Sequence, residues 1–354
     1  MAHNDHPQTP RPPRIRPQLE VITNTDYHDA AGESIPPAVA PPETAPPTPE
    51  TAAHTPLAPT PHETGNPPAT NVLPAHVRDS FHVDSSPAKR LGPAWDYGWQ
   101  VKNVVLIQVT HPDRAAWSSR LRETLKVEGV RIVSPIRTTD GRFINAGWRA
   151  SNFVAGELAR RADETIAAAL RLDAALAQVP IPDSFHVIDY QDVFSVADHA
   201  AWSENHDVVV LDTTDPTHET VVKFMPKVRE WMRPLVDAQG KALPKQVTHA
   251  DMFATTLYAG EQVPTVTDIV GVVHPYGYTA ALAVVDALLM DAVDIGVIDR
   301  FRHVVALEQL ILRALLYRLY VHALHPDTSS NTGTNLGLVC ADVESYMSKR
   351  HGTI

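Results

Sequence analysis

The pattern of hydrophobic and polar residues predicts a strand-rich region over residues 73–156. Its most apolar run, 104–109, has the length of a strand and few polar positions, which is typical of a strand covered on both faces. One segment, 113–127, instead repeats apolar side chains such as Trp117 and Leu121 at helical spacing. The pattern therefore predicts a small sheet with one main helix. The other strands are expected on either side of a turn at Lys102-Asn103, over 130–138 with a break at Pro135, and over 140–156.

After residue 156 the pattern becomes mainly helical. Segment 163–179 is amphipathic, with its apolar side chains on one face. Segment 219–236 has a similar pattern, and Pro226 within it is expected to kink or interrupt the helix. The remaining helices are predicted over 193–204, 278–293 and 302–324.

Two segments of this helical region have other patterns. Residues 246–272 predict a loop, two short strands and a turn at Ala259-Gly260, with the second strand ending at Asp268. Residues 326–354 are polar, and we expect them to be loose. The order of elements predicts a helical region over 157–325 that carries a loop-and-hairpin insert.

Composition sets the first 72 residues apart. Of the 31 prolines in the chain, 17 fall in residues 1–70, which hold no Phe or Trp and a single tyrosine, Tyr27. Such a stretch cannot bury enough apolar surface to offset the entropy lost on ordering. We therefore predict a disordered tail over 1–72, with an extended spacer in its proline-rich part, 36–61.

Charge and cysteine content exclude several classes of protein. The chain has 354 residues, a net charge of −11 and one cysteine, Cys340. It lacks the basic surface with which proteins bind nucleic acid, and one cysteine excludes a disulfide framework within the chain. No apolar run reaches the ~18–20 residues that cross a bilayer, and the N-terminus has no apolar signal segment. We expect a cytoplasmic protein whose partner is a small molecule or another protein, with no membrane or nucleic-acid partner and no indication of its oligomeric state.

One constellation carries candidate chemistry. His249 and Asp251 form a His-x-Asp motif, and Asp268 follows 17 residues after Asp251, at the end of the predicted hairpin. A phosphotransferase needs one carboxylate beside the attacking hydroxyl and another on the magnesium ion that bridges the nucleotide phosphates. A hairpin between two loop carboxylates brings both to one rim of a cleft. The spacing therefore indicates phosphoryl transfer.

Each of these residues also has a structural explanation. We expect His249 to be a buried, hydrogen-bonded organiser of its loop rather than an acid or a base. Asp251 could instead bond backbone amides of the same loop, and Asp268 could cap a turn. Asp286, inside the apolar segment 278–293, is expected to be structural.

The region from about residue 73 to 324 resembles the actinobacterial aminoglycoside-phosphotransferase-like proteins, which have the protein-kinase-like fold. The stretches that carry the resemblance are PAHVRDSF, VVLIQVTHPDRAAWSSRL, GWRASNFVAGE, FSVADHAAWSE, THADMFATTLY and AVVDALLM. The resemblance implies an α+β fold of two lobes. A small antiparallel sheet with one main helix would form the N-lobe over 73–156, and a larger helical C-lobe would follow over 157–325. The disordered proline-rich tail would precede both.

The resemblance also implies roles for individual residues. Asp251 matches the catalytic-loop aspartate, His249 its structural histidine and Asp268 the metal-binding aspartate. Thr256 stands where the family has an asparagine that is a second metal ligand. The implied cofactors are ATP and Mg²⁺. Adenine would bond to backbone groups of the hinge between the lobes, whose candidate residues are Asn152, Phe153, Val154 and Gly156.

Several positions depart from the family pattern. Ile107, in VVLIQV, stands where the family has a lysine that grips the α- and β-phosphates, and Lys102 at the preceding turn cannot replace it. Thr256 is a weaker metal ligand than an asparagine. The phosphate-covering turn, 92–98, carries three bulky residues, and Asp96 among them would place negative charge toward a triphosphate. Losing a phosphate-binding cation and a metal ligand together costs several kcal/mol of transition-state stabilisation, or roughly 10³-fold in rate.

These departures favour a degenerate, pseudokinase-type protein with a binding or scaffolding role, and with weak or absent binding of ATP and Mg²⁺. Two other interpretations stay open. The chain could be an active ATP-dependent small-molecule phosphotransferase that acts on a hydroxyl, with Asp251 as base and Asp268 on Mg²⁺. It could also be a docking protein in which the proline-rich tail binds a partner and the fold is inert. The sequence does not indicate an acceptor substrate.

Overall fold

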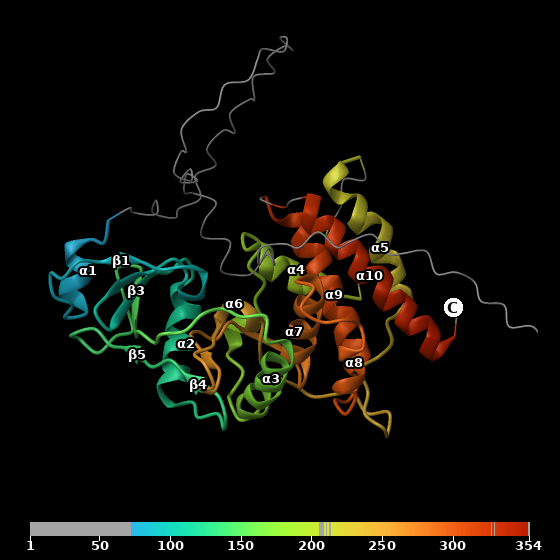
Figure 1. Cartoon of the computed structure of the whole chain (residues 1–354), viewed down its shortest axis with the longest axis horizontal. Helices are drawn as coiled ribbons and strands as arrows, with labels where there is room; N and C mark the ends of the chain where they lie inside the picture. The colour runs from blue at the N-terminus through green and yellow to red at the C-terminus, as the bar shows by residue number, and fades with distance from the viewer. Residues whose placement is uncertain are drawn as a thin grey trace, which may run out of the picture.

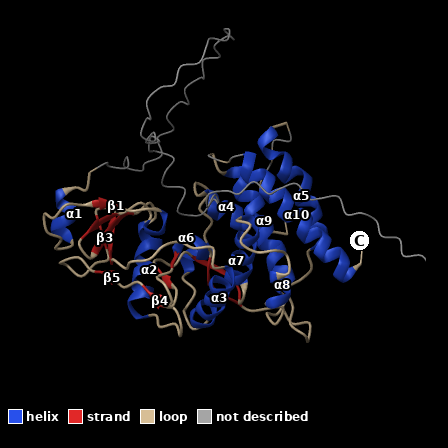
Figure 2. Ribbon diagram, in the orientation of Figure 1, coloured by secondary structure: helices blue, strands red, loops and turns tan. Residues whose placement is uncertain are grey.

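The computed structural model describes residues 72–204, 209, 211, 214–326, 328 and 330–352. The predicted disordered tail and its docking role therefore lie outside the described residues, apart from Val72. Figure 1 shows a strand-rich part beside a larger helical part, and Figure 2 shows the helices concentrated in the second. The two-lobed α+β architecture predicted from the sequence is confirmed. Within the described ranges, no helix is both long and apolar enough to cross a membrane.

The N-lobe is built on one antiparallel sheet. Its strands follow the order β1-β2-β3-β7-β5, and β6 pairs with β7. The predicted turn at Lys102 joins β2 to β3 through a left-handed backbone conformation (φ 53°). The strands of this sheet are β1 (Lys89–Arg90), β2 (Trp99–Val101), β3 (Val104–Gln108), β5 (Pro135–Ile136), β6 (Ile144–Asn145) and β7 (Trp148–Asn152).

The two faces of this sheet have different environments, because successive side chains of a strand point to opposite faces. Leu106 lies on the face that packs against α1 (Ala75–Ser80) in an apolar cluster. Ile107 lies opposite Arg149 of β7 on the other face. That face meets α2 (Pro112–Thr124), the helix predicted for the N-lobe, through a hydrogen bond from Arg122 to Ser151, and it meets the C-lobe through Leu257.

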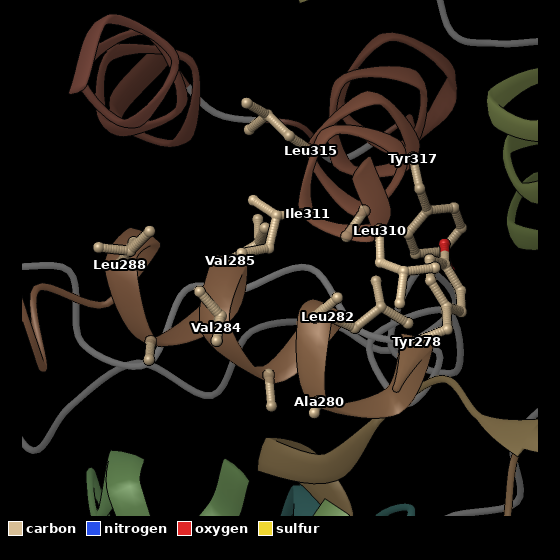
Figure 3. Packing of buried hydrophobic residues seen from close by; sticks show 14 of the residues in the cluster. Tyr278, Ala280, Leu282, Val284, Val285, Leu288, Leu310, Ile311, Leu315 and Tyr317 are labelled. Atoms are coloured by element: carbon tan, nitrogen blue, oxygen red, sulfur yellow. The ribbon is translucent and has the colours of Figure 1, made fainter. Parts of the chain in front are cut away.

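The C-lobe has its core around helix α7 (Tyr278–Leu289). This helix packs against α3 and α9 and is buried over nearly its whole length, since it is apolar on every side. Figure 3 shows its apolar side chains beside those of α9. Asp286 of α7 accepts two hydrogen bonds from Arg318 of α9, at 2.7 Å each, which gives this buried acid a structural role. The other helices are α3 (Ala162–Leu176), α4 (Val193–Trp202), α5 (Glu219–Trp231), α6 (Met252–Thr255), α8 (Val297–Arg300), α9 (Leu307–Leu324) and α10 (Ser330–His351).

Two small sheets carry the predicted loop and hairpin of the C-lobe. β8 pairs antiparallel with β11, which places His249 opposite Gly271. β9 and β10 pair antiparallel and form the hairpin, whose turn includes Gly260. Together they fix both ends of the loop that carries the candidate site. The strands are β8 (Lys245–His249), β9 (Thr256–Leu257), β10 (Thr265–Val266) and β11 (Gly271–Pro275).

The strand predicted over 130–138 divides at Pro135, and its two halves join different sheets. β4 (Arg131–Ile132) pairs in parallel with β10 of the C-lobe, whereas β5 pairs with β7 of the N-lobe. Proline fixes φ and has no N–H to donate, so the backbone does not continue as one strand through it. A segment that belongs to the N-lobe by sequence thus contributes a strand to the C-lobe.

The prediction of a loose stretch over 326–354 is wrong for most of its length. Helix α10 occupies Ser330–His351 and packs against α5, α7 and α9. Two glycines diluted the apolar pattern, but each allows a close approach: a Cβ on Gly333 would lie 2.9 Å from His322, and one on Gly337 would lie 3.3 Å from Phe224. The buried positions recur at helical spacing and are Leu336, Val339, Cys340, Val343 and Met347.

Candidate active site

His249 organises the loop that follows β8. Its side chain is fully buried. The N–H of Val270 donates to Nδ1 at 2.9 Å, so Nε2 carries the proton and donates to the Thr255 hydroxyl at 2.9 Å. That hydroxyl donates in turn to the Asp251 carbonyl at 2.5 Å. Burial lowers the pKa of His249 to about 4. The imidazole is therefore neutral at pH 7 and holds the loop in shape, as the structural explanation predicted.

Asp251 is the N-cap residue of α6, and it is buried, with 1% exposed. Asp251 does not line the pocket beside Asp268 described below. This position gives no direct support to Asp251 as the base that meets a substrate hydroxyl.

Asp268 is held between two arginines from the N-lobe. Arg149 of β7 donates through Nη1 to Oδ2 at 2.6 Å, and Arg122 of α2 places its Nε 3.3 Å from Oδ1. Ser118 of α2 donates to the same Oδ1 at 2.5 Å. Burial opposes the charge of Asp268, but these partners outweigh it and hold its pKa far below the usual range. The carboxylate is ionised, and both of its oxygens already have partners.

Arg122 joins the lobes through a set of buried hydrogen bonds. Its side chain is completely buried. Nη1 donates to the carbonyl of Val133 in the N-lobe and to that of Thr267 in the C-lobe, at 3.0 Å each. Burial lowers the pKa of Arg122 to about 10, which leaves the guanidinium charged at pH 7. A cation therefore lies at the centre of the lobe interface.

Arg149 connects Asp268 to the turn between β1 and β2. Its Nη2 donates to Asp96 at 2.6 Å, while Nη1 holds Asp268. Burial opposes the charge of Arg149, but the two aspartates outweigh it and raise its pKa. Arg149 is the cross-strand neighbour of Ile107, so the cation missing at Ile107 is present one strand away. It is directed at two carboxylates of the chain itself.

The residues near Asp268 do not fit a magnesium site. Thr256, the other predicted metal ligand, is buried in β9, and it is Thr255 that lines the pocket beside Asp268. Among the described residues, no three His, Cys, Asp or Glu side chains come together as a metal site would require. Asp268 itself is bonded to two cations and a hydroxyl.

Two of the predicted hinge residues lie against an apolar cluster. The cluster contains Trp95, Val105, Ile107, Val133 and Leu257, and we call it the interlobe cluster. Phe153 and Val154 pack against it, and the Phe153 ring lies 5.7 Å from the Trp95 ring, centroid to centroid.

The backbone of the hinge is also engaged. The Phe153 N–H donates to the Asn103 carbonyl at 2.7 Å, and the Asn152 N–H donates to the Ser134 carbonyl at 3.0 Å. A Cβ on Gly156 would lie 3.0 Å from the Leu257 side chain, so the chain crosses β9 closely here. Two of the four predicted hinge residues thus have their backbone N–H bonded within the protein.

A pocket with a volume of about 120 Å³ opens beside Asp268. One wall is aromatic: the rings of Trp117 and Phe185 meet edge to face, with centroids 4.7 Å apart. Arg114 and Asp192 lie on its polar side. Burial raises the pKa of Asp192, although His111 and Arg114 oppose the rise. Its lining contains three carboxylates, Asp96, Asp192 and Asp268, together with two arginines, Arg114 and Arg149.

Sequence reasoning missed the two arginines and the serine that surround Asp268. Helix α2 was predicted to bury Trp117 and Leu121, yet its fully buried side chains are Ser118, Ser119 and Arg122. The signal for Arg149 was its place between Trp148 and Ala150 in a strand whose side chains are buried on both faces. A charged residue at such a position requires a partner.

No protein-family model matches the chain, and no curated protein matches it. Among solved structures, the chain is similar to spectinomycin phosphotransferase APH(9)-Ia in complex with ADP and spectinomycin. The identity is 10%, the match covers 76% of this chain and 96% of that chain, and the TM-score is 0.45. It is also similar to a thermostable mutant of aminoglycoside phosphotransferase APH(4)-Ia in its apo form. The identity is 12%, the match covers 76% of this chain and 96% of that chain, and the TM-score is 0.46. The roles of the residues above rest on their own contacts.

Proposed function

We propose that this protein is a pseudokinase-type binding protein that does not transfer phosphoryl groups. The observation that carries the proposal is the position of Asp268 between Arg149 and Arg122. A divalent cation at Asp268 would have to displace two arginines whose side chains are buried. Their charges would then stay buried without the carboxylate that balances them. That arrangement opposes metal binding, because an uncompensated buried charge costs several kcal/mol.

One further observation supports a binding role. The interlobe cluster lies beside the hinge, where Trp95 packs near Phe153. In the proposed role, the protein binds a small molecule or another protein through its surface or through a pocket such as the one beside Asp268.

The test is thermal unfolding of the full chain with millimolar ATP, with Mg²⁺ and with EDTA. A ligand at 100 times its dissociation constant stabilises a protein by about 2.7 kcal/mol, which would raise the melting temperature by roughly 5 °C for a chain of this size. We expect no such magnesium-dependent rise. A rise of that size with Mg²⁺ and ATP, absent in EDTA, contradicts the proposal, as does ATP turnover with any hydroxyl acceptor.

One observation favours an active phosphotransferase as the second candidate. Arg149, the cross-strand neighbour of Ile107, brings a cation to the cleft face of the sheet. If ligand binding released Arg149 from Asp96 and Asp268, its guanidinium could meet a phosphate instead. In that case Asp251→Asn would abolish ATP turnover while changing the melting temperature little. Equal inactivity of both proteins leaves the binding role as the better explanation.

A further inference from the structure

An apolar groove opens on the surface where helix α2 of the N-lobe meets residues 179–182, which follow α3 of the C-lobe. Its volume is about 390 Å³, within the usual range of about 300–1,000 Å³ for ligand-binding clefts. Of the seven described residues that line it, six are apolar and the seventh is Arg120. Trp117 and Leu121 of α2 are partly exposed here, although they also pack against the core. The groove therefore leaves apolar side chains only partly covered by the fold.

The wall of the groove that belongs to the C-lobe is stiff and poor in hydrogen-bond donors. Residues 179–182 read Val-Pro-Ile-Pro, and each proline fixes its own φ and favours an extended conformation in the residue before it. Pro180 and Pro182 have no backbone N–H, so this wall lacks the regular ladder of donors on which an added strand pairs. Recognition must instead come from packing on side chains such as Trp117 and Ile181. Proline-rich segments bind aromatic-lined grooves in this way, because they are already extended before they bind.

The charge of the groove complements the proline-rich segment of this chain. Arg120 is exposed, and no ion pair or side-chain hydrogen bond joins it to the described residues. Segment 36–61 holds ten prolines among its 26 residues, with Glu43 and Glu50 as its acids and no lysine or arginine. One stretch of the chain thus supplies both prolines for the apolar lining and a carboxylate for Arg120.

The length of chain before Val72 allows this segment to reach the groove. If residues 36–49 docked, residues 50–71 would join them to the folded part of the chain. These 22 residues extend to roughly 70 Å, whereas a lobe of this size is only about 30 Å across. A tether of this kind also gives the segment a local concentration on the order of 1 mM, so a weak contact is enough to keep it bound.

We propose that the groove between α2 and residues 179–182 binds the chain's own proline-rich segment, 36–61. Prolines of the segment pack on the apolar lining, and one of its two glutamates pairs with Arg120. The inference goes beyond the proposed function, because it does not depend on whether the protein binds a nucleotide or a metal ion. Trp117 lines this groove and also the pocket beside Asp268, so the docked segment lies against a wall of that pocket.

The test is photo-cross-linking within the full chain. Thr44→Cys and Thr55→Cys place a thiol inside the proline-rich segment, and each variant is labelled with benzophenone maleimide. Cys340, the one native cysteine, is 2% exposed and burial raises the pKa of its thiol, so the introduced thiol reacts first. The same label on Thr25→Cys, outside the segment, is the control for random contacts. Mass spectrometry identifies the linked residues, and gel electrophoresis separates links within one chain from links between two.

We expect the label at Thr44→Cys or Thr55→Cys to link within one chain to 117–121 or 179–182. The label at Thr25→Cys should link there at least fivefold less. Absence of links to the groove from both positions overturns the proposal, and so does an equal yield from the control position. Links formed only between two chains overturn occupancy by the chain's own segment and assign the groove to a second copy.

Variants of the groove decide whether its side chains hold the segment. Ile181→Ser and Arg120→Glu should each reduce the yield of groove links at least threefold, and Glu43→Arg with Glu50→Arg should restore it in the Arg120→Glu chain. The matched control is Lys241→Glu, at an exposed cation of the C-lobe that does not line the groove, and it should behave as the parent. Because Arg120 is exposed, its variant tests the groove even where Ile181→Ser lowers stability. An unchanged yield in Arg120→Glu and in folded Ile181→Ser overturns the groove as the site.

Discussion

The Asp268→Asn variant is predicted to be less stable than the parent. In a site that gathers acids for a metal ion, removing one acid relieves repulsion and commonly raises stability. Here the acid balances two buried arginines, Arg122 and Arg149, so removing its charge leaves theirs uncompensated. The sign of the change in stability therefore separates a metal ligand from a member of an ion-pair network.

The magnitude follows from the contacts of Asp268. Breaking a buried ion pair by removing one partner costs about 3–5 kcal/mol. Asparagine keeps one oxygen that can accept from Ser118, now 2.5 Å from Oδ1, so the lower end of that range applies, about 3 kcal/mol. For a chain of this size that loss lowers the melting temperature by roughly 5 °C.

The assay is urea unfolding at pH 7, followed by tryptophan fluorescence, with thermal melting alongside. A second variant, Asp268→Asn with Arg149→Met, removes one buried cation as well and is expected to recover part of the loss. Asp84→Asn is the control, because its ion pair with Lys102 is exposed and its loss should leave the midpoint unchanged.

The pH dependence gives an independent check. The arginines hold the pKa of Asp268 below its ordinary value of 3.8, so the folded chain keeps this carboxylate ionised where the unfolded chain protonates it. The stabilisation is therefore complete above pH 3.8 and is lost as the pH falls below it. The difference between parent and variant should follow the same course. An Asn variant as stable as the parent at pH 7, or more stable, would refute the reasoning.

Three further outcomes follow from other parts of the fold. Burial lowers the pKa of His249 from 6.5 to about 4, so on acidification the unfolded chain binds this proton before the folded chain does. Relative to His249→Gln, the parent should therefore lose about 3 kcal/mol of stability as the pH falls from 6.5 to 4, which urea titrations at each pH would measure. Asp286→Leu should cost about 3–5 kcal/mol and its combination with Arg318→Met much less, by chemical unfolding; equal losses would show that the pair is not the cause. Gly271→Ala should cost about 1–3 kcal/mol, since its Cβ would lie within 2.7 Å of two aromatic rings, whereas Gly92→Ala meets open space and should leave the melting temperature unchanged.

The elements with strong local patterns could be predicted from the sequence. The apolar run of β3, the amphipathic repeat of α3 and the apolar helix α7 each carry their own signal, and the structure places them where the periodicity predicted. His249 was predicted to be a buried, hydrogen-bonded organiser of its loop, and it is buried with both ring nitrogens bonded. These are properties of neighbouring residues, which a sequence displays directly.

The ion-pair network could not be predicted in the same way. Arg149 and Asp268 are 119 positions apart, and Arg149 and Asp96 are 53 positions apart, so no local pattern connects them. Helix α2 also differs from the expectation that a helix buries its apolar side, because its buried residues are Ser118, Ser119 and Arg122. The charge of Asp96 was noted as unfavourable to a triphosphate, but its partner became visible only when the strands paired. Partners of buried charges are set by topology rather than by spacing.

The pairing of β4 with β10 restricts rigid-body rotation between the two lobes. The Arg131 N–H donates to the Pro264 carbonyl and the Val133 N–H to the Val266 carbonyl, at 2.9 Å each, so swinging one lobe away from the other would break main-chain bonds. The polypeptide therefore tethers the lobes at this strand as well as at the linker after β7. Entry of a molecule between them depends on local rearrangement of a few residues, and the angle between the lobes should stay nearly constant whether a ligand is bound or not.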